Sequence, residues 1–241
     1  MSKAHIKHPS VRIRIPPVRI RISILANPQL VRESLAVLIG SSKDFQVIST
    51  VGFDSEWSER TKLKDSDVAV IYLETGDPVE IISGVRADYP KMKIVAITDG
   101  DDLESSTKAL KFGAVGIVQS LQGSNLLFEA IRQAFRGETW LNQRLLSSLL
   151  QNWPSSKGSK TNGKIGPAND SLTPREVEVV SMIGKGLKSK IIAEGLAISE
   201  ATVRHHLSSI YGKLGVDDRL NLIIYAYENG LVRLGDDSND G

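Results

Sequence analysis

The sequence predicts two folded domains in series: an α/β domain built on a doubly wound parallel sheet, then an all-α domain of four helices. Up to about residue 140, five short apolar runs alternate with amphipathic stretches, the order that a parallel sheet with helices on both faces requires. After a stretch rich in Ser, Gly, Lys, Asn and Pro, only helical patterns follow. We expect the α/β domain at 18–140, a connecting helix and flexible linker at 141–170, and the helical domain at 171–234.

The composition is that of a soluble globular protein. The chain has 241 residues, enough for two modest cores, with 41% hydrophobic and 24% charged residues. It has no cysteine, which excludes disulfides, thiolate metal sites and thiol redox sensing. No apolar run has the length of a membrane span, and the N-terminus lacks the apolar core of a signal peptide. We therefore predict a cytoplasmic protein without a membrane partner.

Charge is unevenly distributed. Six of the 30 Lys and Arg residues lie within 1–22, where no acidic residue occurs, so the rest of the chain holds 24 basic and 28 acidic residues. Val11–Ile15 recurs as Val18–Ile22 across two prolines. The second copy leads into the first predicted strand, and the first is predicted to be a basic N-terminal arm (1–17), because the prolines interrupt any ladder. At the other end, 235–241 is predicted to be a disordered acidic tail.

The elements of the α/β domain follow from its apolar pattern. The predicted strands are Ile20–Leu25, Phe45–Val51, Val68–Leu73, Lys93–Thr98 and Val115–Val118. The predicted helices are Gln29–Ile39, Val79–Ala87, Asp102–Phe112 and Leu126–Arg136, with Leu141–Leu150 as the connecting helix. Sheets of this class place their sites at the carboxyl ends of the strands, so candidate site residues are sought there.

The helical domain opens with a clear start signal. Thr173 is placed to cap a helix, Pro174 suits the first helical position, and Glu176 lies three residues after the cap. A second helix is predicted over Lys190–Leu196 and a turn over the next three residues, of which Ser199 caps a third helix running to about Lys213. This order predicts a helix-turn-helix.

The third helix has two unlike faces. Its core stripe is Val203, Leu207, Ile210 and Leu214. The opposite face is slim, polar and poor in acidic residues: Ala201, Arg204, His205, Ser208, Ser209 and Gly212. Small residues with a few donors suit a helix that lies in a DNA major groove. On composition alone, an ordinary solvated face explains this pattern about as well.

A family resemblance favours the DNA-binding interpretation. The matching residues are Leu172–Glu176, Gly186-Leu187, Lys190, Ile192-Ala193, Ile198-Ser199, Thr202–Arg204, His206-Leu207, Ile210-Tyr211 and Lys213–Val216. Together they resemble the output domain of LuxR/NarL-type transcription regulators, whose partner is double-stranded DNA. The resemblance also implies a homodimer in which a fourth helix supports dimerisation, here through Leu220, Ile223, Ile224 and Tyr227. Lys188 and Ile191 depart from the polar cap and the acidic residue usual in that family.

The predicted DNA contacts fall into two groups. Arg204 and His205 are the candidates for reaching bases. The candidates for phosphates are Lys190, Thr202, Ser208, Ser209 and Lys213. His206 lies nearer the core edge, and it points about 100° away from His205, which argues against a metal pair.

The α/β domain is similar to the receiver domain of a response regulator, the output half of a two-component system. The similarity rests on Asn27–Leu35, Gly113–Gly116, Glu129–Arg132 and Gly137-Glu138. It implies a flavodoxin-like fold, and with the helical domain it extends the resemblance over nearly the whole chain.

The receiver-like domain departs from its family where phosphorylation would occur. A working receiver needs a strand-end Asp, an acidic pair for Mg²⁺, a Lys, and a Thr or Ser. Here the acidic pair falls on Ala26 and Asn27, the acceptor on Tyr72 and the Lys on Ser120, and Thr98 alone is retained. The sequence therefore predicts a degenerate, atypical receiver with no metal or cofactor. Glu74 lies nearby, but it would lack both metal and Lys.

Two uses of that domain remain open from sequence. In the first, the fold is kept for dimerisation or partner binding and its pocket is inert. In the second, Asn27, Tyr72, Thr98 and Ser120 line a pocket that holds a small molecule or a partner side chain. The first needs fewer assumptions, because nothing in the sequence names a ligand.

Two other function classes agree less well with the sequence. An autoinducer-type ligand-responsive LuxR regulator would share the helix-turn-helix, but its ligand domain is not five alternating strand–helix units, and Trp57 has Thr61 where that class has Tyr. An enzyme is not expected, because there is no Gly-rich phosphate loop, no nucleophile elbow and no His between residues 9 and 204.

Overall fold

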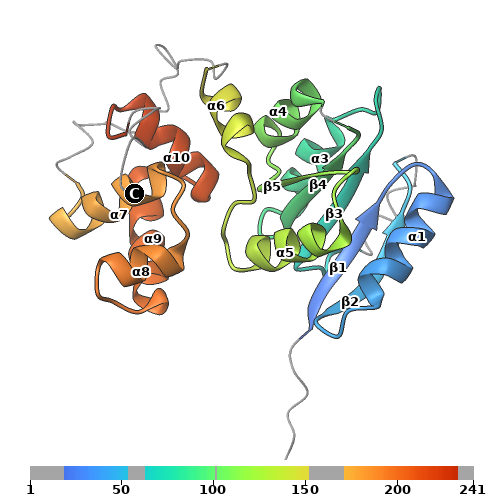
Figure 1. Ribbon diagram of the computed structural model, residues 1–241, viewed down its shortest axis with the longest axis horizontal. Coiled ribbons are helices and arrows are strands. Elements are labelled where there is room, and N and C mark those ends of the chain that lie inside the picture. The colour runs from blue at the N-terminus through green and yellow to red at the C-terminus, as the bar shows by residue number, and fades with distance from the viewer. Residues whose placement is uncertain (1–18, 54–62, 101, 152–170, 233–241) are drawn as a thin grey trace, which may run out of the picture.

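The computed structural model describes residues 19–53, 63–100, 102–151 and 171–232. Two bodies are visible in Figure 1, an α/β domain and a helical domain, with α6 (Gln143–Gln151) between them. The predicted basic arm, most of the linker and the acidic tail lie outside the described residues, as does Trp57.

The α/β domain is a five-stranded parallel sheet in the order β2-β1-β3-β4-β5. Its strands are β1 (Ile20–Leu25), β2 (Phe45–Val51), β3 (Val68–Leu73), β4 (Lys93–Thr98) and β5 (Gly116–Gln119). Its helices are α1 (Gln29–Gly40), α3 (Ile81–Asp88), α4 (Leu103–Lys111) and α5 (Ser124–Phe135). All the strands and helices predicted for this domain are confirmed, with shifts of a few residues at their ends.

Side chains of the central strand alternate between two cores. Val68 and Val70 of β3 belong to the cluster covered by α1 and α5, whereas Ala69 and Ile71 belong to the one covered by α3, α4 and α6. A strand buried on both faces needs an unbroken apolar run, which is why Val68–Ile71 is entirely apolar and entirely buried. The doubly wound fold predicted from sequence follows from this packing.

The helical domain has a core of its own. Its helices are α7 (Pro174–Gly184), α8 (Ser189–Gly195), α9 (Glu200–Leu214) and α10 (Arg219–Glu228). Val203, Leu207 and Ile210 of α9 are buried in this core, so the predicted inner stripe is confirmed. The helix ends at Gly215, whose φ of 66° is a conformation that glycine adopts at little cost.

The two domains share an apolar contact through α6 and α10. Leu145, Leu149 and Leu150 of α6 pack into the α/β core, and Leu220 and Ile224 of α10 join the same cluster. Leu146 of α6 packs against both that cluster and the helical core. Within the described residues, no helix is long and apolar enough to cross a membrane.

Candidate nucleic-acid interface

Helix α7 begins with a capping box, and its Glu176 also holds α9. The Glu176 amide donates to Thr173 Oγ1 (3.3 Å), and the Thr173 amide donates to Glu176 Oε2 (2.7 Å). The same carboxylate accepts from Ser209 Oγ (2.7 Å) and from Lys213 Nζ (2.6 Å), both on α9. One buried side chain therefore fixes the start of α7 and the rotation of α9 about its axis.

The charge on Glu176 is stable inside the domain. Burial opposes ionisation, but the hydrogen bonds from Lys213, Thr173 and Ser209 outweigh it and lower the pKa of Glu176 from 4.5 to about 2. Only 3% of the residue is exposed to solvent. Glu176 is therefore a structural anion at physiological pH.

The turn between α8 and α9 is also fixed by specific contacts. Ala197 has φ = 53°, in the left-handed region that disfavours residues with a Cβ. The guanidinium of Arg175 donates to the Leu196 carbonyl (2.5 Å), and Ser199 Oγ caps α9 by accepting from the Thr202 amide (3.0 Å). These contacts set the angle at which α9 leaves α8.

The outer face of α9 is open to solvent. Arg204, His205 and Ser208 are exposed there, beside the small exposed residues Ala201 and Gly212. Arg204 lies 3.7 Å from Glu200, and about half of each side chain is exposed. An ion pair this exposed is weak, so the guanidinium can leave it for a stronger acceptor. On α8, Lys190 is exposed as well.

Two of the predicted phosphate contacts have a different partner here. Ser209 and Lys213 are expected from sequence to be free donors, but both are bound to Glu176. The reason is geometric: positions 209 and 213 lie one turn apart, on the edge of α9 that faces α7. His206 is half-buried, as expected for the core edge.

Comparison with known proteins gives the family. Residues 170–226 match the model for bacterial regulatory proteins of the luxR family. The chain is 31% identical over 216 residues to transcriptional regulatory protein LnrK of Bacillus subtilis (strain 168), covering 88% of this chain and 98% of the relative. The chain belongs to the luxR family of bacterial regulatory proteins.

Two further matches also extend over most of the chain. The chain is 29% identical over 215 residues to oxygen regulatory protein NreC of Staphylococcus aureus (strain JH9), covering 88% and 99% of the two chains. A solved structure, the response regulator ChrA of a heme-sensing two-component system, covers 88% of this chain and 98% of its own, with 24% identity and a TM-score of 0.43. The protein is a DNA-binding transcriptional response regulator of LuxR/NarL type, not an enzyme.

At the strand ends of the α/β domain, an arginine stands beside the positions of the expected acidic pair. Ala26 is fully buried, and Arg32 of α1 donates through Nη1 to the carbonyls of Ala26 (2.5 Å) and Asn27 (2.6 Å). The Asn27 side chain accepts from the Phe53 amide (3.2 Å). The guanidinium of Arg32 therefore places a positive charge against these two backbone carbonyl oxygens.

Two polar side chains at the strand ends are hydrogen-bonded to acidic residues that are not among the predicted site residues. Ser120 Oγ donates to Asp99 Oδ1 (3.0 Å), and Asn27 Nδ2 donates to Asp77 Oδ1 (3.4 Å). Thr98 is fully buried and hydrogen-bonded to Ser106 (3.1 Å). Burial, followed by the charges of Asp99, Glu74 and Asp77, raises the pKa of Tyr72. Asp77 and Asp99 lie in loops after strands, and only the tertiary fold brings them to this site.

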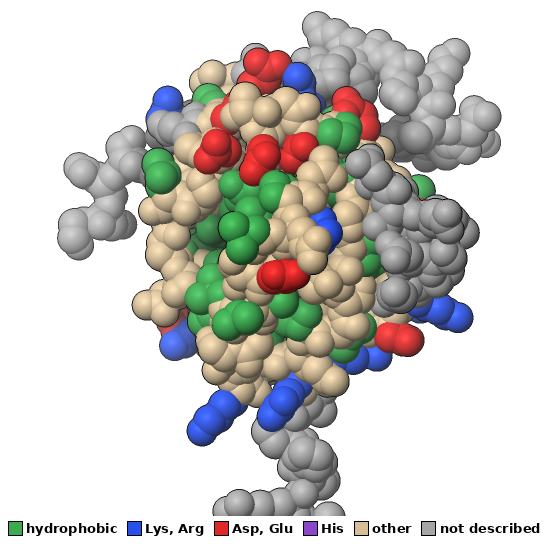
Figure 2. All heavy atoms as spheres, turned by 90° about the vertical axis from the view of Figure 1, so that its right-hand side faces the viewer, with side chains coloured by type: hydrophobic (Ala, Val, Ile, Leu, Met, Phe, Trp, Pro, Cys, Tyr) green, Lys and Arg blue, Asp and Glu red, His purple; other side chains and the backbone are tan. Residues whose placement is uncertain are grey.

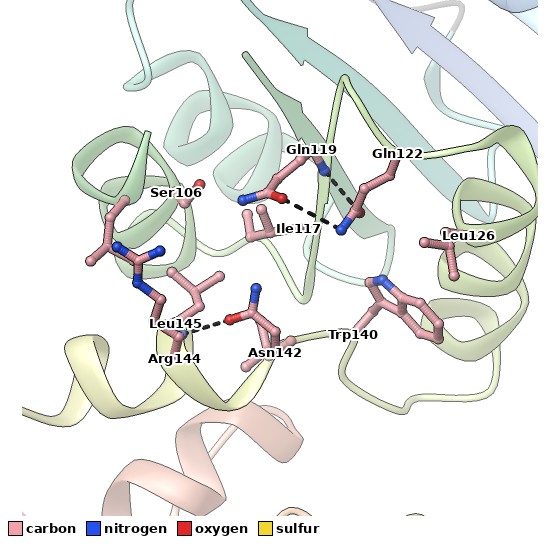
Figure 3. A pocket seen from close by; sticks show the side chains of 11 residues that line it. Ser106, Ile117, Gln119, Gln122, Leu126, Trp140, Asn142, Arg144 and Leu145 are labelled. Carbon is pink, nitrogen blue, oxygen red and sulfur yellow. Dashed lines mark hydrogen bonds between the residues drawn. The ribbon is translucent and has the colours of Figure 1, made fainter. Parts of the chain in front are cut away.

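A small cavity lies beside these residues, on the α6 side of the sheet. Its volume is about 150 Å³. Figure 3 shows its polar edge, formed by the amides of Gln119, Gln122 and Asn142, with Trp140 and Leu126 on one side. Because Asn142 and Leu145 belong to the connecting segment and α6, the cavity touches the junction between the domains. Of the four residues predicted to line a pocket, none lines this cavity.

The predicted dimerisation residues are covered within this chain. Leu220, Ile223 and Ile224 are buried, and Tyr227 is half-buried. Leu220, Ile224 and Tyr227 pack on the α/β side, while Ile223 packs in the helical core. The dimer interface therefore stays a prediction, and one that requires the domains to move apart. Outside the junction, α1 exposes Leu30, Val37 and Leu38, and Figure 2 shows hydrophobic side chains gathered on that side of the molecule.

Proposed function

We propose that this regulator reads double-stranded DNA with α9, acts as a homodimer without aspartyl phosphorylation, and is controlled by docking of its receiver-like domain onto the helical domain. The proposal rests on the contrast between two faces of the helical domain. The polar face of α9 is open to solvent, whereas the predicted dimerisation face of α10 is packed against the receiver-like domain. A DNA-binding regulator works on the chromosome, so we expect it in the cytoplasm.

In the proposed complex with DNA, Arg204 and His205 contact bases. Lys190, Thr202 and Ser208 contact phosphates. The exposure of Lys190, Arg204, His205 and Ser208 supports this assignment, and so do the small neighbours that allow close approach to a groove. Thr202 is half-buried, and its hydroxyl is hydrogen-bonded to Ser199 Oγ (2.8 Å), so it has to exchange that partner for a phosphate. We assign Ser209 and Lys213 to holding α9 against Glu176. Lys213 keeps about a third of its side chain exposed, so it adds to the positive field near the helix.

The chemistry at the strand ends supports independence from phosphorylation. Mg²⁺ requires oxygen ligands, usually carboxylates, and the pair positions here are an alanine and an asparagine whose carbonyls accept from Arg32. A phenol at position 72 cannot form an acyl phosphate, and the raised pKa of Tyr72 keeps it protonated. Ser120 in place of Lys leaves a phosphoryl group without its counter-charge.

A phosphodonor experiment tests this part. The full chain is incubated with Mg²⁺ and acetyl phosphate, and intact mass and DNA affinity are then measured. We expect no mass increase and an affinity within about twofold of the untreated protein. A stoichiometric phosphoryl adduct with tighter DNA binding would contradict the proposal.

Docking control is tested by comparing DNA affinity of the full chain with that of residues 165–241 on the same fragments at the same salt concentration, because affinity depends steeply on salt. The helical domain has its own core, which makes the shorter chain a fair comparison. We expect the full chain to bind more weakly, since docking covers Leu220 and Ile224. Equal or tighter binding by the full chain would indicate instead that the receiver-like domain is a constitutive dimeriser, for which the exposed apolar side of α1 is the candidate surface.

A second candidate is control by a small molecule, favoured by the cavity in Figure 3. Its walls belong to α4, β5, α5, α6 and the segment leading into α6, so an occupant would contact Trp140, whose ring faces Lys188 of the helical domain. This cavity, rather than the strand-end pocket, is where a ligand-responsive form of the protein would bind its effector. Thermal shift of the full chain against a panel of small polar metabolites tests it.

A further inference from the structure

Helix α8 begins without a cap of its own. Its N-cap residue is Lys188, whose side chain makes no capping hydrogen bond. The first four amides of a helix have no partner within it, and Ser, Thr, Asp or Asn at the N-cap normally satisfies one of them. By contrast, Thr173, Ser199 and Asp218 each cap their own helix in this domain.

An acceptor for one of these four amides comes from the other domain. Glu138 lies in the segment after α5, and its Oε1 accepts from the amide of Ser189, the first residue of α8 (3.3 Å). Its Oε2 lies 3.1 Å from Nη1 of Arg219, the first residue of α10. The two side chains are 12% and 3% exposed, so this ion pair is largely removed from water.

Arg219 connects the two helix starts on the helical side. Its guanidinium donates to the Leu187 carbonyl and, through Nη1, to Ser189 Oγ (3.3 Å). Lys188 itself points across the junction, with Nζ 5.5 Å from the centre of the Trp140 ring. The residue that would usually cap α8 is thus used to contact the receiver-like domain.

A second ion pair with the charges reversed lies at the same junction. Arg86 of α3 donates through Nη2 to Asp218 Oδ2 (3.1 Å), while Asp218 Oδ1 caps α10 by accepting from the Asn221 amide (3.0 Å). The junction therefore contacts the first turns of both α8 and α10.

We infer that Glu138 is a positioning residue for α8: the receiver-like domain supplies an acceptor to the unpartnered amides at the start of α8, where the side chain of Lys188 supplies none. The stability of α8, the first helix of the helix-turn-helix, therefore depends on domain docking. When the domains separate, α8 loses its acceptor while α7, α9 and α10 keep theirs. Separation therefore frees the α10 face and at the same time loosens the helix that carries Lys190. This inference concerns the folding of α8 and holds whether or not the proposed control of DNA binding is correct.

The test is hydrogen exchange of the full chain without DNA, comparing Glu138→Ala, the double variant Glu138→Ala/Lys188→Ser, and Glu104→Ala as the matched control. Glu104 is an exposed carboxylate on α4, paired with Lys108. We expect Glu138→Ala to speed exchange in 189–196 by roughly three- to thirtyfold, the equilibrium equivalent of one lost cap. The double variant should restore protection of α8 without restoring the domain contact, and Glu104→Ala should change neither.

Two outcomes would overturn the inference. One is unchanged exchange over 189–196 in Glu138→Ala. The other is a rise that the serine at position 188 fails to reverse, which would show that α8 responds to general loss of docking and not to its cap. If Glu138→Ala is too unstable to study, residues 165–241, which lack Glu138, replace it. Lys188→Ser should then slow exchange over 189–196 more in this shorter chain than in the full chain, and an equal effect in both would count against the inference.

Discussion

The helix-turn-helix and the strand ends of the receiver-like domain are two polar sites held in different ways. Each is organised by a charged side chain: Glu176 in the first, Arg32 in the second. Glu176 is found where the family motif predicts it, and its contacts run between two helices of one domain. Arg32 binds backbone carbonyls at the two positions where the expected carboxylates are absent. The helix-turn-helix is thus held by a residue of the family motif, whereas the strand ends are held by an arginine on the neighbouring helix α1.

The largest expected effect comes from removing the organising charge of the helix-turn-helix. Glu176→Ala should cost about 3 kcal/mol of unfolding free energy, at the low end for a broken buried pair because the Lys213 ammonium reaches solvent. Urea unfolding, monitored by hydrogen exchange of the α7 and α9 amides, measures the loss of unfolding free energy. Glu178→Ala, an exposed carboxylate two residues on, is the control and should change stability little. A small loss of unfolding free energy in Glu176→Ala would show that Glu176 does not organise the helix-turn-helix.

The carboxylate of Glu176 also predicts that the helical domain loses stability in acid. Its pKa of about 2 in the folded state lies below the ordinary value of 4.5, so its contribution is fully present above pH 4.5 and is lost as the pH falls toward 2. The protection factors of the α9 amides, which are observed exchange rates corrected for the intrinsic effect of pH, should therefore fall over this range in the unmodified protein. In Glu176→Gln, which cannot titrate, the pH dependence of α9 should flatten. An unaltered dependence would place its cause in other carboxylates.

Removing the proposed base reader should affect recognition and not stability. Arg204→Ala is expected to cost about 1–3 kcal/mol of discrimination between target and non-target DNA, while its exposure predicts an unchanged melting temperature. Competition binding on the two DNAs at fixed salt measures the effect. Glu200→Ala, which removes the ion-pair partner, should retain selectivity. A variant at 204 with full sequence preference would show that a different face of α9 reads DNA.

A smaller effect is expected at the turn. Ala197→Gly should stabilise the helical domain by about 0.5–1 kcal/mol, because relief of the left-handed strain exceeds the entropy that glycine adds to the unfolded chain. Residue 197 is exposed, so no packing is lost. Urea unfolding checks the sign, and destabilisation would mean that the turn carries no strain.

The smallest effect on DNA affinity is expected at the strand ends of the receiver-like domain. Tyr72→Phe removes only the phenolic oxygen, and DNA affinity should stay within about twofold if the site is inert. Thr98 should be the more sensitive position there, because its hydroxyl is buried and hydrogen-bonded. A large loss of affinity in Tyr72→Phe would show that an occupant of the strand-end pocket controls DNA binding.

The sequence by itself determined the parts that depend on local chemistry. The apolar runs placed every strand of the sheet, and the start signal at Thr173 predicted a capping box that the structure contains. The inner stripe of α9 followed from helical spacing. These features are predictable because hydrophobic period and capping act over a few residues.

Only the tertiary structure decided which partner each polar side chain has. Ser209 and Lys213 looked like free donors on one helix, yet a residue more than thirty positions earlier in the chain binds both. Lys188 read as a weak helix start, and the acceptor that compensates it is Glu138, about fifty residues away in the other domain. Such pairings depend on distances between elements, and no local pattern records them, because burial rather than sequence spacing selects the partner of a charge.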